Sequence, residues 1–199
     1  MPEIRLDPGP GGQSISVAAL RPADIIVSTT DANVSRFIRF GTGSEVSHAM
    51  LYYGGRSVVE AIQPGVVLRS LDNALADANL AVAYRRRGVP PEAANEIVQW
   101  ARAQSGKPYD ARGAVAHAPK PVIVALGGLS GRHLARRERV RTDTANDRFF
   151  CSQLVIRAFA EAGYPIITGE QANKNPEQLV QAWGHGLLTY VGHLLDFSD

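Results

Sequence analysis

Cysteine is the scarcest reactive residue in this sequence, because the 199 residues contain only Cys151. A lone cysteine cannot form an intramolecular disulfide, and no set of spaced cysteines and histidines provides a structural zinc site. Cys151 is therefore either a small buried apolar residue or a reactive thiol. A chain of this length with 45% hydrophobic residues can bury a core without cross-links, and we expect no metal or other cofactor.

Long apolar runs are also missing. The longest, from Val122 to Leu129, is far shorter than the roughly 20 residues that cross a bilayer. The first 22 residues lack the positive start and apolar run of a secretory signal, which predicts a cytoplasmic protein and leaves export by a signal-independent route open. A formal net charge of +2, with no basic stretch interleaved with aromatic residues, argues against a nucleic-acid partner.

The hydrophobic patterning predicts a single α+β domain over residues 1–199, with an irregular N-terminal arm over 1–22 and a variable insertion over 111–148. The first half is rich in strand signals and the second half in helix signals. We expect strands over 23–29, 48–53, 56–62, 66–68 and 80–84, and helices over 31–41, 70–78, 90–106 and 149–162.

Cys151 falls at the start of the clearest predicted helix. Apolar residues recur from there at helical spacing, which places Cys151 on the face turned toward the protein. The backbone N–H groups and the dipole at a helix N-terminus favour a thiolate, the form of cysteine that attacks carbonyl carbons. The alternative is that Cys151 is simply the first residue of an apolar stripe.

A thiol nucleophile needs a base, and the base needs a partner that fixes its orientation. His48 and Glu60 lie on the two arms of the predicted hairpin. A two-residue Gly54-Gly55 loop would put them on opposite faces, whereas a three-residue loop ending in a left-handed Gly55 would set them directly across from each other. We therefore predict the three-residue loop. An unpaired Glu60 in an apolar strand would be costly, which also favours a partner.

The order of these motifs resembles the permuted NlpC-type papain-like proteins, the YiiX-like group related to lecithin retinol acyltransferase. The resemblance covers about residues 23–165, and histidine and glutamate precede the cysteine as in the permuted branch. This sequence differs from the family at Ala23, where the family often has glycine, and at Gln153, where an acidic residue is common. The motifs that carry it are Asp24-Ile25-Ile26, Gly43 to Tyr52, Val59-Glu60-Ala61, Gly65-Val66, Tyr109-Asp110 and Phe150 to Val155.

The resemblance implies a circularly permuted papain-like fold, with an antiparallel sheet packed on helices. It implies a cysteine hydrolase in which Cys151 is the nucleophile, His48 the general base and Glu60 the group that orients the histidine. Tyr109 matches a family tyrosine near the thiol, and its phenol could donate to the developing oxyanion. Packing of Tyr109 on Pro108 is an equally good interpretation. The other histidines, including His193, are expected at the surface or in loops.

The substrate is left open by the sequence. The family includes cell-wall peptide hydrolases and lipid acyl hydrolases or transferases. An amide, such as one in a cell-wall peptide, and a lipid acyl group are therefore both candidate substrates. A binding module without activity is the third possible function. The apolar run 121–129 and the arginine-rich run 131–141 favour a buried loop followed by a solvated helix. The alternative is a lid that contacts lipid or an anionic membrane.

Overall fold

The computed structural model describes residues 12–30, 48–108, 150–166 and 186–194. Seven strands form one mixed sheet in the order β1-β7-β6-β2-β3-β4-β5. Only β1 and β7 pair in parallel among these strands. The elements are β1 (Ser14–Ile15), the 3₁₀ helix η1 (Val17–Ala19), β2 (Ile25–Thr30), β3 (His48–Gly54), β4 (Ser57–Ala61), β5 (Val66–Ser70), α2 (Leu71–Leu75), β6 (Ala78–Arg86), α3 (Pro91–Ala103), α7 (Cys151–Glu161) and β7 (Leu188–Leu194). The predicted α+β class is confirmed.

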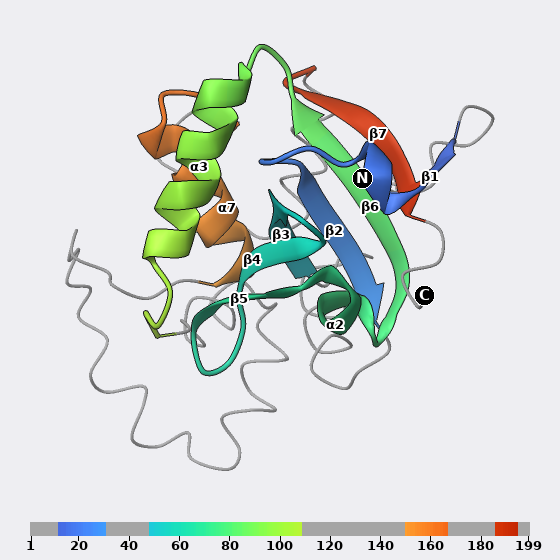
Figure 1. Cartoon of the computed structure of the whole chain (residues 1–199), viewed down its shortest axis with the longest axis horizontal. Coiled ribbons are helices and arrows are strands. Elements are labelled where there is room, and N and C mark those ends of the chain that lie inside the picture. The colour runs from blue at the N-terminus through green and yellow to red at the C-terminus, as the bar shows by residue number, and fades with distance from the viewer. Residues whose placement is uncertain (1–11, 31–47, 109–149, 167–185, 195–199) are drawn as a thin grey trace, which may run out of the picture.

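Helices cover both faces of the sheet. Figure 1 shows α3 and α7 side by side on one side of the sheet, with α2 apart from them beside β5. Alternate residues of β3 and β4 serve the two faces, as the period of two in a strand requires. Leu51 and Val59 join the core under α3 and α7, whereas Met50 and Val58 join the core around η1 and α2.

The helices begin where the sequence predicts. Ser70 caps α2 by accepting a hydrogen bond from the Asn73 N–H at 3.3 Å, and Pro91 opens α3 as its first residue. The predicted extension of α2 to residue 78 is wrong, because Ala78 already begins β6. Pairing with β2 along its length outweighs the weak helical preference of this short segment.

The N-terminal arm is more ordered than predicted. Over residues 14–19 the irregular arm is replaced by β1 and η1, and Ser14 and Ile15 pair with His193 and Leu194 of β7. Val17 is buried in the core around α2. Strand β7 was not predicted at all, and His193 lies in it rather than in a loop, with its Nδ1 2.5 Å from the Tyr190 hydroxyl.

The predicted hairpin register is wrong by two residues. Leu51 pairs with Val59 and Gly54 with Ser57, so the turn consists of Gly55 and Arg56, both in the left-handed region (φ +57° and +56°). An irregularity between Tyr52 and Gly54 absorbs the extra residue. Because of this bulge, His48 and Glu60 lie on the same face of the sheet, as they would with a three-residue loop. They are diagonal neighbours rather than directly opposite each other.

The predicted helix over 31–41, the insertion over 111–148 and Tyr109 lie outside the described residues.

Candidate functional site

His48 and Glu60 meet across the β3–β4 hairpin. His48 is the first residue of β3, and its Nε2 lies 2.5 Å from Oε2 of Glu60. An ionised carboxylate can only accept hydrogen bonds, so Nε2–H of the imidazole donates and the other ring nitrogen, Nδ1, is left for a further partner. The contact fixes both the tautomer and the orientation of the ring.

Glu60 is completely buried, and both of its oxygens have partners. Oε2 accepts from His48, and Oε1 accepts from Nε of Arg69 on β5. Burial by itself would raise the pKa of Glu60, but the hydrogen bonds and positive charges of His48 and Arg69 outweigh it and lower the pKa below its usual value. Glu60 is therefore held as a carboxylate although no part of it touches solvent.

Cys151 is the first residue of α7, and its side chain is 4% exposed. The first intrahelical hydrogen bond joins the Leu154 N–H to the Phe150 carbonyl, so the Cys151 N–H precedes the helical ladder and is directed out of the helix end. The thiol is a near neighbour of the His48 imidazole, and its presence raises the pKa of that ring. Helix α7 packs on β3 and β4, and this packing brings the thiol to the hairpin.

The charges around His48 favour its protonated form. Burial lowers the pKa of His48, but its interactions with Cys151 and with the carboxylate of Glu60 raise it from the usual 6.5 to about 10. An imidazolium between a sulfur and a carboxylate is the arrangement in which a histidine can hold a thiolate and later release its proton. The site can therefore support nucleophilic attack by sulfur with proton transfer through one imidazole.

The structure thus brings together three of the four predicted site residues, Cys151, His48 and Glu60. Tyr109 lies outside the described residues, although the bridge between Gly65 and Pro108 shows where the preceding chain is held. Sequence reasoning missed Arg69. The sequence signal is the apolar run around Glu60, which indicates that this carboxylate needs partners but does not say on which strand they lie.

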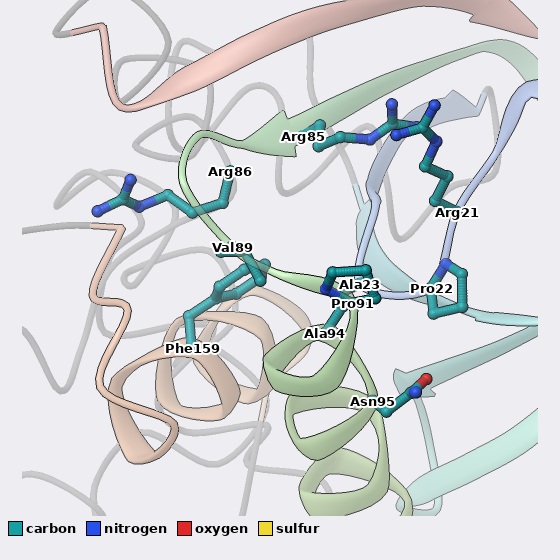
Figure 2. Close-up of a pocket in the computed structure, with 10 residues that line it drawn as sticks. All are labelled: Arg21, Pro22, Ala23, Arg85, Arg86, Val89, Pro91, Ala94, Asn95 and Phe159. Carbon is teal, nitrogen blue, oxygen red and sulfur yellow. The ribbon is translucent and has the colours of Figure 1, made fainter.

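One cavity of the described residues, of about 350 Å³, lies away from the thiol. It is lined by Arg21, Arg85 and Arg86 together with apolar residues that include Phe159, two helical turns along α7 from Cys151. Figure 2 shows the guanidinium groups of Arg21 and Arg85 near each other, while Arg86 points away from them. The cavity adjoins the start of β2, whereas His48 pairs with Ser28 near its end, so we do not assign the chemistry to this cavity.

Comparison with known proteins supports the family that the site resembles. Residues 19–114 match the model of the family described as permuted papain-like amidase enzyme, YaeF/YiiX, C92 family. That segment includes His48 and Glu60 and ends before Cys151. The chain is 27% identical over 201 residues to the probable lipoprotein peptidase YaeF of Escherichia coli (strain K12), covering 92% of this chain and 73% of that protein. These likenesses support a papain-like amidase or peptidase, and hence an enzyme.

A solved structure supports the fold. The crystal structure of the metalloprotein yiiX from Escherichia coli O157:H7 (DUF1105) is similar with a TM-score of 0.51 and 19% identity, over 88% of each chain. In the described part of the present chain, no group of three or more His, Cys, Asp or Glu side chains is placed to hold a metal ion. Within the same residues, no helix has the length and apolar character needed to cross a membrane.

Proposed function

We propose that this protein is a papain-like cysteine amidase that cleaves its substrate through a thioester intermediate. The observation that carries the proposal is the continuous link from Cys151 through His48 to Glu60, assembled from α7, β3 and β4. Each group has the partner that its role requires: a sulfur at a helix start, an imidazole beside it, and a buried carboxylate behind the imidazole.

In the first half-reaction, the Cys151 thiolate attacks the amide carbonyl and forms a tetrahedral oxyanion. The Cys151 N–H at the start of α7 is placed to donate to that oxygen, and Tyr109 stays a predicted second donor. Nδ1–H of His48 then protonates the leaving nitrogen as the C–N bond breaks. An amine leaves, and the acyl group remains on sulfur as a thioester.

In the second half-reaction, His48 removes a proton from water as the water oxygen attacks the thioester carbonyl. The C–S bond breaks, a carboxylic acid is released, and the sulfur leaves as a thiolate beside the reprotonated His48, which restores the starting pair. Glu60 stays ionised throughout and holds the ring so that Nδ1 faces the reacting atoms. If an alcohol or amine replaces water, the same residues transfer the acyl group instead.

For the substrate we propose an amide in a peptide, such as a cell-wall peptide, because the matching family is described as an amidase and YaeF as a peptidase. A lipid ester or lipid amide is the alternative for the same site. Nothing in the described residues favours lipid contact, since the arginine-rich segment 131–141 lies outside them. A binding module without activity would have no use for a buried carboxylate kept ionised behind a histidine.

The test is a substrate panel of muropeptides, lipid amides and lipid esters, incubated with wild type and with Cys151→Ala and analysed by mass spectrometry. We expect cleavage of a peptide amide by wild type and loss of activity by about 10³-fold or more in Cys151→Ala. Trapping of an acyl group on Cys151 would identify the intermediate. Product from lipid substrates alone would move the assignment to lipid acyl chemistry, and equal turnover by Cys151→Ala would refute it.

A further inference from the structure

We propose that Arg69 is a positioning residue that fixes Glu60 as a permanently charged carboxylate and so completes the catalytic relay as its fourth member. This inference rests on the proposed function of Cys151 and His48. It adds a residue that neither the sequence patterns nor the comparisons with known proteins identified.

The strand register places Arg69 where it can reach Glu60. On β4 and β5, Glu60 pairs with Val67 and Val58 pairs with Arg69, so Arg69 and Glu60 are diagonal neighbours on one face. Nε of Arg69 donates to Oε1, while Nε2 of His48 donates to Oε2. A carboxylate held at both oxygens cannot rotate without losing one of the two contacts.

The charge on Arg69 decides where the proton of the relay resides. A buried carboxylate beside an imidazolium can take its proton, which would leave a neutral acid and a neutral imidazole and would remove the counter-ion of the thiolate. A guanidinium does not lose its proton in proteins, so Arg69 opposes protonation of Glu60 at every working pH. The result is a chain of charges that alternate in sign from His48 through Glu60 to Arg69, with the Cys151 thiol beside the imidazole.

Arg69 is only partly buried, with 34% of its side chain exposed, whereas Glu60 is fully buried. Solvent can therefore hydrate the outer part of the guanidinium, which lowers the cost of bringing this cation to the site. The chain provides a matched control in Arg85, another partly exposed arginine, which pairs with the fully buried Asp24. In the part of the chain that the structure describes, Arg85 is bonded to Asp24 and Ala19 and not to the thiol, the imidazole or Glu60.

The experiment measures the rate of Cys151 alkylation by iodoacetamide between pH 5 and 10 in wild type, Arg69→Gln, Arg69→Lys and Arg85→Gln, with folding checked by circular dichroism. We expect Arg69→Gln to slow alkylation at pH 7 by about tenfold and to move the profile to higher pH, Arg69→Lys to do so less, and Arg85→Gln to leave the profile unchanged. Adding guanidinium ion at a non-denaturing concentration should restore part of the rate in Arg69→Ala.

If Arg69→Gln does not fold, Arg69→Lys is combined with Glu60→Gln in a double-mutant cycle to test the role of Arg69. The effect of Arg69→Lys should disappear in a Glu60→Gln background, because it acts through that carboxylate. An effect that persists there, or wild-type profiles in the folded Arg69 variants that lack the positive charge, overturns the inference. Wild-type alkylation that does not respond to His48→Ala overturns the proposed function itself, whereas a normal His48 response with unchanged Arg69 variants overturns only the role of Arg69.

Discussion

Two buried carboxylates, Asp24 and Glu60, serve opposite purposes in this protein. Both are fully buried and both are bound by an arginine. Asp24 accepts from two nitrogens of Arg85, at 2.7 and 2.6 Å, and from the Arg21 backbone N–H at 2.8 Å. Glu60 gives one oxygen to Arg69 and the other to His48. Asp24 immediately precedes β2, whereas His48, the partner of Glu60, pairs with Ser28 toward the other end of that strand.

The comparison separates a structural ion pair from one that belongs to the relay we propose. Every side-chain partner of Asp24 among the described residues is a nitrogen of Arg21 or Arg85, and the Asp24–Arg85 pair holds the start of β2 to the end of β6. Glu60 is linked to an imidazole and, through it, to a thiol, and both of these can exchange protons. Burial and an arginine partner are therefore common to the two sites, and the nature of the second partner distinguishes them.

The largest effect is expected from breaking the structural pair. Asp24→Asn leaves Arg85 without its buried counter-ion, and we expect the free energy of unfolding to fall by about 3 kcal/mol or more. Alkylation of Cys151 in the folded variant should stay at the wild-type rate, because Asp24 is at the far end of β2. Urea denaturation and iodoacetamide kinetics measure the two quantities, and a clear loss of thiol reactivity in folded Asp24→Asn would contradict the separation of the sites.

Changes at Glu60 should act mainly on reactivity. Glu60→Ala removes the acceptor that orients His48, and we expect turnover to fall by about 10²-fold or more. Glu60→Gln retains an acceptor without the charge, so its loss should be smaller, about tenfold. Turnover of the peptide substrate and thiol alkylation provide parallel measurements. Wild-type rates in Glu60→Ala would show that the carboxylate is only structural, like Asp24.

The third prediction concerns the titration of His48. Because its negatively charged partners favour the imidazolium, the ring should remain protonated well above pH 6.5 in wild type. Burial favours the neutral ring, and in Cys151→Ala the sulfur no longer opposes this effect. The pKa of His48 should therefore fall by about one pH unit or more. Ring ¹⁵N chemical shifts measured from pH 5 to 10 report this, with Asp24→Asn as the unaffected control. A His48 that titrates at 6.5 in both proteins would contradict the proposed relay.

The smallest effect should come from the residue next to Asp24. Ala23 adopts a left-handed conformation with φ +67°, which costs a residue with a Cβ about 1 kcal/mol, whereas glycine adopts it freely. The greater freedom of glycine in the unfolded chain offsets part of this gain. Ala23→Gly should raise the free energy of unfolding by about 0.5 kcal/mol and leave alkylation unchanged. If Ala23→Gly lowers the free energy of unfolding, the packing of the Ala23 methyl group stabilises the protein by more than its left-handed conformation costs.

Local patterns predicted much of the fold and the site. The hairpin, the α2 cap, the start of α3 and the helix that begins near Cys151 all depend on neighbouring residues, so they can be read from short stretches of sequence. The conclusion that His48 and Glu60 share a face was right, although the register behind it was wrong. A bulge near Gly54 changes the register by local backbone geometry that glycine spacing alone does not specify.

Long-range partners could not be predicted in the same way. Strand β7 contains the strand-favouring residues Thr189, Tyr190 and Val191, but Gly192 interrupts them. Its partner β6 lies about 100 residues earlier, so its place in the sheet could not be read from its neighbours in sequence. Arg69 resembles an ordinary exposed arginine in a short strand. Its importance becomes visible only when β5 is paired with β4 and Glu60 is found to be buried.

The chain order of the site has a consequence for synthesis. His48, Glu60 and Arg69 lie on three consecutive antiparallel strands, whereas Cys151 follows about 80 residues later. A ribosome therefore makes the acid–base part of the site first, as a meander whose contacts are short in sequence and form early. The thiol is made afterwards and meets its imidazole only when α7 docks on β3 and β4. If Cys151 is the nucleophile that we propose, its contact with His48, and hence its activation, begins only with the completed fold.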